Sequence, residues 1–345
     1  MQFQTAPAAL VVALAAYSVT LACLWLLLSR FGRRLMLDRP NERSLHERPV
    51  PRSGGIAIAA GIAAGVAAHA AMGGAAVPFV FVVTLAVAGA LALVSLADDI
   101  LTLPTRLRLA AHLAAAGAVL GVGMGISDPM PFALLLLAVA WYANLYNFMD
   151  GSDGLAGGMA VFGFGAYAWA AHQSGHAALA VLGGAVAVAS LAFLLMNFHP
   201  ARLFMGDVGS VPLGFLAGAL GVLGWRDGVW PLWFPLLVFA PFVCDATLTL
   251  LKRLLRRERI WQAHKDHYYQ RLVRMGIGHR GVAWIEYAVM AGCTAIALLI
   301  RTAEPGMQAV AVGAATAALV AIAVWVDARW VRWKRAQENS GGAPA

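Results

Sequence analysis

The sequence has little charge, few cysteines and no early basic residue. Asp, Glu, Lys and Arg make up only 12% of its 345 residues, 61% are hydrophobic, and the mean hydropathy is +0.74. Because a soluble domain has roughly twice that charged fraction, the composition indicates a membrane protein. The three cysteines lie inside apolar runs without CxxC or Cys/His spacing, which argues against a disulfide framework or a zinc site. No Lys or Arg precedes Arg30, so we expect residues 8–28 to form a retained first helix rather than a cleaved signal peptide.

What is present is a series of long apolar runs. They are continuous, unlike the alternating pattern of a membrane β-barrel, and a helix needs about 20 apolar residues to cross a bilayer. We therefore predict an all-α polytopic membrane protein with about eleven transmembrane helices, of which 157–172 is the shortest. The expected spans are 8–28, 54–72, 77–97, 108–126, 131–149, 157–172, 177–196, 208–225, 230–251, 282–301 and 307–326.

The basic residues predict the orientation. If the N-terminus is outside, 23 of the 25 Lys and Arg residues fall on the inner side, in 29–53, 98–108, 197–207, 252–281 and 327–345. Because cytoplasmic loops carry the excess of Lys and Arg, we expect a cytoplasmic C-terminus. The net charge of +8 then faces the anionic inner leaflet and phosphate-bearing substrates rather than nucleic acid. We expect one membrane domain, 1–330, followed by a cytoplasmic tail at 331–345; its functional loops are 29–53, 98–107, 150–156, 197–207 and 252–281.

Carboxylates gather where apolar runs meet these inner loops. Asp98 and Asp99 end one run; adjacent acids there are costly unless paired or metal-linked, and their repulsion raises one pKa, which suits a proton acceptor. Asn147, Asp150 and Asp153 lie in NLYNFMDGSDGLAGG at 144–158, and their oxygens suit Mg²⁺ and sugar or base hydroxyls. The alternative for Asp98 and Asp99 is a solvated pair that contacts nearby arginines. The alternative for the 144–158 motif is an Asx-rich turn capped by glycines.

Two further segments carry candidate metal and phosphate ligands. Asp207, in NFHPARLFMGDVGS at 197–210, directly precedes a helix, where a carboxylate can hold a metal whose phosphate partner binds backbone N–H groups, or can merely cap the helix. His264, His267 and Arg271 lie in a segment, 253–280, whose apolar residues recur at helical spacing. This pattern predicts an amphipathic interfacial helix with a cationic face for a diphosphate; the alternative is a solvated basic face.

The first inner loop is the last candidate for phosphate binding. His46 and Arg52 lie in DRPNERSLHERPVPRSGG at 38–55, which ends in a glycine pair that opens a helix. Arginine clusters and helix N-termini both favour phosphate, although an ordinary positive-inside loop has a similar composition.

Together, the acids for a divalent cation and the bases for a diphosphate indicate phosphoryl transfer at the membrane surface. Four motifs, DD at 98–99, NLYNFMDGSDGLAGG, ARLFMGDVGS and AHKDHYYQRL, resemble those of the polyprenyl-phosphate N-acetylhexosamine-1-phosphate transferases, relatives of the phospho-MurNAc-pentapeptide translocase. The resemblance runs in order from about residue 38 to 281. It implies that undecaprenyl phosphate attacks the β-phosphorus of a UDP-N-acetylhexosamine, releasing UMP at the inner membrane of a bacterium.

The resemblance also implies roles for individual residues. Asp207 matches the family's Mg²⁺ ligand, which Asn147 is expected to join, with Mn²⁺ as the alternative metal. Asp98 and Asp99 are expected to activate the lipid phosphate, with Asp150 as a further catalytic candidate. The residues expected to surround the uridine nucleotide are Asp150, Asp153, Asn197 and Phe204. Those expected to bind the diphosphate are His264, His267 and Arg271, with His46 and Arg52 as further substrate contacts. The expected partners are the lipid phosphate, the UDP-sugar and membrane lipid, with a homodimer as a candidate assembly.

The chain departs from many relatives at Tyr269 and Gln270, where they have further histidines. The form HKDHYYQRL looks more like the branch that initiates O-antigen or other cell-surface polysaccharides, whose sugars include GlcNAc and 6-deoxy-HexNAc derivatives. MurNAc-pentapeptide is therefore not the expected sugar.

A lipid-substrate transporter or flippase is the main rival, but it predicts midplane charges and internal repeats, whereas these acids gather at one face. An intramembrane aspartyl protease would need GxGD, and Phe204 replaces the first glycine. Asp245, inside the 230–251 span, is a functional candidate as an intramembrane acid; the alternative is an ion pair with an arginine of 252–259.

Overall fold

The computed structural model describes residues 6–29, 37–38, 49–125, 128–259, 262 and 264–339. His46 lies outside the described residues. The described chain is almost entirely helical, with one two-stranded antiparallel ribbon between β1 and β2. Its elements are α1 (Ala6–Leu27), β1 (Leu37–Asp38), β2 (Val50–Pro51), α2 (Gly54–Ala71), α3 (Phe79–Leu101), α4 (Thr105–Gly123), α5 (Pro129–Phe148), α6 (Leu155–Gln173), α7 (Ala177–Asn197), α8 (Asp207–Arg226), α9 (Trp233–Val238), α10 (Ala240–Leu255), α11 (Tyr268–Leu272), the π-helix η2 (Val273–Ile277), α12 (Gly278–Ile300) and α13 (Pro305–Asn339).

The predicted class, an all-α polytopic membrane protein, is confirmed. Eight of the described helices are long and apolar enough to cross a membrane. Ten of the eleven expected spans coincide with one helix each, and 230–251 coincides with two, α9 and α10. Because α4, α6 and the segment of α9 and α10 fall outside that set of eight, the number eleven stays a prediction. The expected 230–251 span is broken at Phe239, because Pro241 opens α10 and cannot donate the hydrogen bond that would continue α9.

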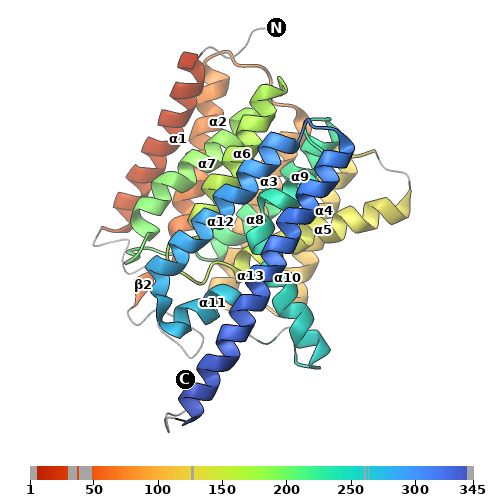
Figure 1. The fold of residues 1–345 in the computed structure, drawn as a ribbon. Helices are drawn as coiled ribbons and strands as arrows, with labels where there is room; N and C mark the ends of the chain where they lie inside the picture. The colour runs from red at the N-terminus through yellow and green to blue at the C-terminus, as the bar shows by residue number, and fades with distance from the viewer. Residues whose placement is uncertain are drawn as a thin grey trace.

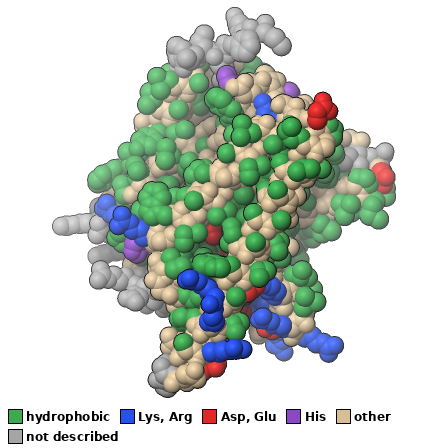
Figure 2. All heavy atoms as spheres, in the orientation of Figure 1, with side chains coloured by type: hydrophobic (Ala, Val, Ile, Leu, Met, Phe, Trp, Pro, Cys, Tyr) green, Lys and Arg blue, Asp and Glu red, His purple; other side chains and the backbone are tan. Residues whose placement is uncertain are grey.

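The helices form an elongated bundle with chemically different ends (Figure 1). The described part of α1 begins at one end and α13 finishes at the other, continuing unbroken into the expected tail as far as Asn339. On the visible face, Lys and Arg side chains gather around the end where α13 finishes, while hydrophobic side chains cover the flanks (Figure 2). Exposed Phe79 and Leu299 are of the kind that a bilayer covers. This distribution has the polarity that the positive-inside pattern predicts.

The central helix is α8, which is buried over most of its length and packs against α3 and α5. Small residues allow this close packing. A Cβ on Gly214 would overlap the Tyr142 carbonyl of α5, and one on Gly218 would approach the Tyr142 Cβ to 3.0 Å. The first residue of α8, Asp207, is therefore held beside the end of α5.

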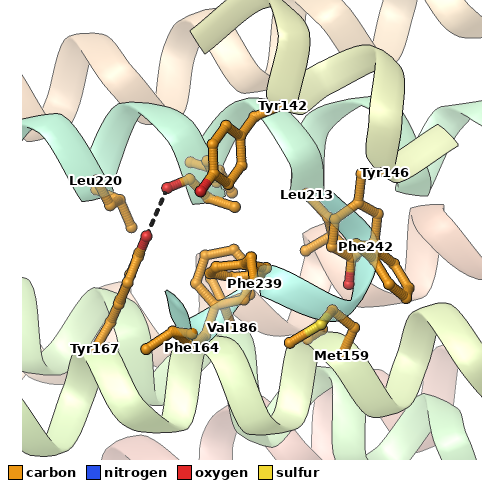
Figure 3. Packing of buried hydrophobic residues seen from close by; sticks show 14 of the residues in the cluster. Tyr142, Tyr146, Met159, Phe164, Tyr167, Val186, Leu213, Leu220, Phe239 and Phe242 are labelled. Carbon is orange, nitrogen blue, oxygen red and sulfur yellow. Dashed lines mark hydrogen bonds between the residues drawn. The ribbon is translucent and has the colours of Figure 1, made fainter. Parts of the chain in front are cut away.

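An aromatic cluster fixes the segment around the helix break (Figure 3). Phe239 packs edge-on against Tyr142 and Tyr167, with ring centroids 5.9 and 5.6 Å apart. The Tyr167 hydroxyl donates to the Ala217 carbonyl of α8 at 2.9 Å. Tyr146, in the last turn of α5, donates to the Ala156 carbonyl of α6 at 2.7 Å. Because this bond spans the 149–154 turn, it holds the polar turn between two rigid helices.

Candidate active site

The central carboxylates meet where α5 ends and α8 begins. The Asn147 amide lies against Asp207, with Nδ2 3.5 Å from Oδ2, and Asn147 Oδ1 accepts a hydrogen bond from Ser210 Oγ at 2.8 Å. Asp150 accepts a hydrogen bond from the Gly206 N–H and lies near enough to Asp207 for the two charges to interact. Residues from two motifs about sixty positions apart are thus brought together, as the sequence led us to expect.

Asp150 has a strongly perturbed acidity. Burial raises its pKa well above the usual value for an aspartate, the negative charges of Asp207 and Asp38 raise it further, and the Gly206 hydrogen bond lowers it. Two neighbouring buried carboxylates repel each other unless one of them is protonated or a cation lies between them. The pair is therefore a place where a cation would be favourable.

The aspartate pair at the end of α3 is asymmetric. Asp98 is fully engaged: Oδ1 accepts from the Leu103 N–H at 2.7 Å, and Oδ2 pairs with Arg108 at 3.1 Å. Asp99 has one ion pair, from Oδ1 to Arg52 at 3.2 Å, while its buried Oδ2 has no hydrogen-bond partner among the described residues. Asp98 thus caps the end of α3, and Asp99 is the member of the pair with an oxygen available to accept a hydrogen bond or a proton.

The two arginines facing this pair are also incompletely used. The buried Nε atoms of Arg52 and Arg108 have no hydrogen-bond partner in the described structure. Guanidinium groups bind phosphate through several N–H donors. Arg52 was predicted as a substrate contact, whereas Arg108 is one of the nearby arginines that the sequence analysis considered only as partners of the aspartate pair. Both are therefore placed to receive an anion.

The start of α2 does not offer the backbone phosphate site that its glycine pair suggested. The Gly54 and Gly55 N–H groups donate to the carbonyls of Phe204 and Met205, each at 2.9 Å, and the Phe204 N–H donates to the Pro51 carbonyl at 2.7 Å. These N–H groups are already paired, so the expectation of a phosphate on this helix N-terminus is wrong. The contacts instead fasten the loop before α8 to the segment that carries Arg52.

Asn197 and Phe204, two residues expected around the nucleotide, have structural contacts of their own. Buried Asn197 accepts from the Gly154 N–H and donates to the Leu203 carbonyl, both at 3.0 Å. It thereby braces the 150–154 turn against the 198–206 loop. Phe204 is partly buried within that loop. Their contact with a nucleotide stays a prediction.

Asp153 lies in a group that the sequence analysis did not identify. Its Oδ2 accepts from His199 Nδ1 at 2.6 Å and from the Ala201 N–H at 3.1 Å. His279, from the start of α12, stacks on His199 with ring centroids 5.6 Å apart and bonds Ser152 Oγ through Nδ1 at 2.9 Å. The only signal in the sequence was the position of His199 inside the NFHPARLFMGDVGS motif.

The histidine segment is organised by Asp245. Its Oδ1 lies 2.9 Å from His267 Nδ1 and accepts from the Tyr268 N–H at 3.0 Å, while Oδ2 accepts from the Tyr269 N–H at 3.0 Å. The Thr249 hydroxyl also donates to Oδ1, at 3.2 Å. The alternative that Asp245 pairs with an arginine of 252–259 is therefore wrong: the carboxylate caps the first turn of α11 and orients His267.

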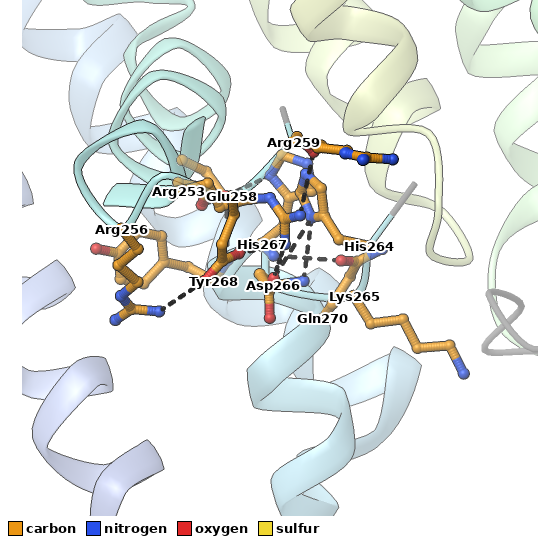
Figure 4. A network of polar contacts seen from close by, with 12 residues as sticks. Arg253, Arg256, Glu258, Arg259, His264, Lys265, Asp266, His267, Tyr268 and Gln270 are labelled. Atoms are coloured by element: carbon orange, nitrogen blue, oxygen red, sulfur yellow. Dashed lines mark hydrogen bonds and ion pairs between the residues drawn. The ribbon is translucent and has the colours of Figure 1, made fainter. Parts of the chain in front are cut away.

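The polar network around His264 controls its charge (Figure 4). The pKa of His264 is lowered to about 4, chiefly by burial and then by the neighbouring His267 and Arg253. The rings of the two histidines lie 4.9 Å apart, and Arg253 forms ion pairs with Asp266 and Glu258. His264 is therefore neutral near pH 7 and can bind a diphosphate only as a neutral N–H donor unless the ligand itself raises the pKa.

Arg271 does not lie on an open cationic face. Its side chain is 4% exposed and pairs with Asp327 of α13 at 2.8 Å. Lys252 pairs with the same carboxylate, and the Tyr268 hydroxyl donates to it at 3.4 Å. The expected long amphipathic helix is also wrong: the segment folds as short α11 and the π-helix η2, which is interrupted at Gly276, where φ is +92°. Contact of Arg271 with a diphosphate stays a prediction.

The donor set fits a magnesium ion better than a metal held wholly by the protein. Among the described residues, no group of three or more His, Cys, Asp or Glu side chains is arranged to hold a metal. Mg²⁺ is commonly held by one or two carboxylates plus water and substrate phosphates. Asp207 and Asp150 would supply the carboxylates, and rotating the Asn147 amide would turn its oxygen towards Asp207 while Ser210 Oγ accepts from its Nδ2.

Comparison with known proteins assigns this site to a family. The sequence pattern of glycosyl transferase family 4 matches residues 79–224, from α3 to α8. The chain is 30% identical over 270 residues to a probable undecaprenyl-phosphate N-acetylglucosaminyl 1-phosphate transferase of Bacillus subtilis, covering 73% of the chain and 74% of that relative. It is 30% identical over 340 residues to a decaprenyl-phosphate N-acetylglucosaminephosphotransferase of Mycolicibacterium smegmatis, covering 86% and 81%.

A shorter match of higher identity is with a phospho-N-acetylmuramoyl-pentapeptide-transferase of Symbiobacterium thermophilum, 44% identical over 106 residues that cover 30% of this chain and 32% of the relative. The resemblance carried by the four motifs thus extends over most of the sequence. The chain belongs to glycosyl transferase family 4, the polyprenyl-phosphate N-acetylhexosamine-1-phosphate transferases.

Proposed function

We propose that this protein transfers an N-acetylhexosamine 1-phosphate from a UDP-sugar to undecaprenyl phosphate at the cytoplasmic face of a bacterial inner membrane. A lipid phosphate oxygen bonds to the phosphorus that carries the sugar, the bond from that phosphorus to the bridging oxygen breaks, and UMP leaves. The observation that carries the proposal is the meeting of Asp99, Asp150 and Asp207 with Arg52 at the inner ends of separate membrane helices. The names of the relatives support the same reaction class.

The proposed reaction needs charge neutralisation and positioning more than covalent catalysis. Arg52 and Arg108 would bind the non-reacting phosphate oxygens through their unused guanidinium donors. Asp99, whose Oδ2 is free, would orient the attacking lipid phosphate and take up its remaining proton. Asp98 would serve indirectly, because its oxygens hold the turn after α3 and the Arg108 side chain.

Asp207, Asn147 and Asp150 would hold Mg²⁺ beside these groups. When bound, the ion would neutralise charge on the diphosphate of the donor and stabilise UMP as it leaves. Mn²⁺ has the same preference for oxygen ligands and is the expected substitute. The cation would also offset the repulsion between Asp150 and Asp207.

The sugar is proposed to be GlcNAc or a 6-deoxy-HexNAc derivative, and the product to initiate O-antigen or another cell-surface polysaccharide. Both rest on the HKDHYYQRL form of the histidine motif. The N-acetylglucosamine in the names of the relatives is consistent with the first choice of sugar.

The test is turnover by the purified full-length protein. It is incubated with undecaprenyl phosphate, MgCl₂ and a panel of UDP-N-acetylhexosamines labelled in the sugar, with EDTA as the metal control. We expect UMP release and labelled lipid with at least one donor, and loss of both with EDTA. Absence of UMP release with every donor would refute the transferase proposal, and EDTA-resistant turnover would refute the metal site.

A further inference from the structure

We propose that His199 is the positioning residue for Asp153, and that together they set the affinity for the nucleotide half of the donor. The proposal rests on the function proposed above, because it assigns the cytosolic substrate of that reaction to this group. His199 lies in the loop before α8, and Asp153 lies in the turn after α5. The contact between them was not evident from the sequence, because 46 residues separate His199 from Asp153.

The hydrogen bond fixes the state of both groups. An ionised carboxylate only accepts, so His199 Nδ1 must carry the proton in the 2.6 Å contact with Asp153 Oδ2. The Ala201 N–H donates to the same oxygen at 3.1 Å. The other oxygen, Oδ1, lies 4.0 Å from Nδ1 of His279, which is beyond hydrogen-bond distance, and it accepts no hydrogen bond from the described residues. One oxygen of Asp153 is thus held, while the other can accept from a ligand.

The imidazole that holds Asp153 is itself braced. The His279 ring stacks on that of His199 with an angle of 11° between the planes, and His279 Nδ1 is tied to Ser152 Oγ at 2.9 Å. The group therefore joins three separate segments: the turn at 152–153, the loop at 199–201 and the start of α12. Such an arrangement restricts Asp153 to one orientation before any ligand arrives, which lowers the entropy cost of binding.

The location indicates which substrate this group serves. The turn that carries Asp153 also carries Asp150, and the loop that carries His199 continues into Gly206, whose N–H binds Asp150. The imidazole pair therefore borders the carboxylate site. The His199 side chain is 39% exposed, whereas that of Asp153 is 9% exposed, so the pair lies at the solvent edge of the site. A lipid acceptor arrives from the bilayer, while the water-soluble nucleotide arrives from this edge.

The chemistry at Asp153 narrows the recognised group. A carboxylate oxygen with no donor of its own accepts hydrogen bonds from N–H or O–H groups and repels phosphate. The nucleoside offers such donors on its base and ribose, and so does the N-acetylhexosamine, whereas the phosphates do not. UMP lacks the sugar, so binding of UMP separates the nucleoside from the sugar. We therefore assign Asp153 Oδ1 to a donor of the nucleoside, with His199 setting its direction.

The test uses two isosteric substitutions of His199. Asparagine places an amide N–H near the position of Nδ1 and can keep the bond to Asp153, whereas glutamine places it near Nε2 and cannot. UMP binding by the purified protein is measured by calorimetry, and KM is measured separately for the UDP-sugar and for undecaprenyl phosphate. His176→Ala, at the opposite end of the bundle, is the matched control.

We expect His199→Gln and His199→Ala to weaken UMP binding and raise the donor KM about tenfold or more, the usual effect of losing a hydrogen bond to a charged group. His199→Asn should stay within about threefold of wild type, and the KM for undecaprenyl phosphate should not change in any variant. Equal losses in His199→Asn and His199→Ala, or unchanged UMP binding in His199→Ala, would overturn the positioning role.

The outcome is separable from that of the proposed reaction. If the wild type releases no UMP from any donor, the transferase proposal fails, while UMP binding by the variants still reports on His199. If the wild type turns over but His199→Ala binds UMP normally, only the positioning role fails. No UMP binding by the wild type would overturn the assignment of this group to the nucleotide.

Discussion

Asp245 supports the clearest stability prediction, because its carboxylate has four donors in a buried site. Both Asp245 and its partner His267 have side chains no more than 6% exposed. Asp245→Ala would leave the imidazole and the N–H groups of Tyr268 and Tyr269 without their acceptor. Breaking a buried charged pair costs about 3–5 kcal/mol. Since each kcal/mol shifts the midpoint of thermal unfolding by roughly 2–4 °C in proteins of 150–250 residues, we expect a decrease of at least about 5 °C.

The assay is tryptophan fluorescence of the detergent-solubilised protein during heating, together with UMP release. Asp245→Asn should have an intermediate effect, because its single oxygen can still accept while its amide N–H opposes one of the backbone donors. Turnover should fall in Asp245→Ala, since His267 loses the contact that orients its ring, and should fall less in Asp245→Asn.

The matched control is Asp227→Asn at the opposite end of the bundle. Asp227 pairs with its neighbour Arg226, and their side chains are 23% and 26% exposed, respectively. Exposed ion pairs contribute about 0–1 kcal/mol, so the midpoint should change by about 2 °C or less. If Asp245→Ala lowers the midpoint no more than this control, the capping role assigned to the carboxylate is incorrect.

Three further predictions address the site directly. Asp207→Ala should lower UMP release by about 100-fold or more without a large change in the unfolding midpoint; retained turnover would remove Asp207 from the metal role. Gly55→Ala should impair folding and activity, because its Cβ would overlap the Gly209 backbone where α2 meets α8, whereas Gly89→Ala, with open space around it, should behave as wild type in both assays. The pKa of His264 is lowered to about 4, so the folded state binds fewer protons than the unfolded chain between about pH 6.5 and 4 and loses stability as the pH falls through that range. His264→Gln should therefore lose less of its unfolding midpoint than wild type between pH 7.5 and 5; an equal loss would contradict the assigned pKa.

The asymmetry of the 98–99 pair illustrates how far a sequence motif reaches. Two adjacent aspartates at the end of an apolar run predict a functional pair, but the sequence does not distinguish the role of one from that of the other. The αL residue Thr102 turns the chain after α3, so that the Leu103 N–H binds Asp98, while Arg52, from before α2, reaches Asp99. The different contacts of Asp98 and Asp99 therefore depend on a turn conformation and on a contact between distant segments.

The charged residues of the histidine segment show the opposite limit. Their helical spacing indicated a cationic face, yet Arg271 is buried against Asp327, and the segment is a short helix followed by a π-helix. The spacing of side chains predicts a periodicity, but it does not show which distant carboxylates will pair with the cations. Asp245 comes from the expected 230–251 span, and Asp327 directly follows the expected 307–326 span in the long helix α13.

The sequence by itself determined the class of the protein, the approximate position of its helices, the end of the bundle that carries the polar motifs, and the family. These properties are local or additive: hydropathy accumulates along one run of residues, and the basic bias is a count over loops. Only the tertiary structure decided that α8 occupies the centre, that His199 holds Asp153 and that Asp245 holds His267. Each of these depends on contacts between segments that lie far apart in sequence, which meet only after close helix packing has excluded the other arrangements.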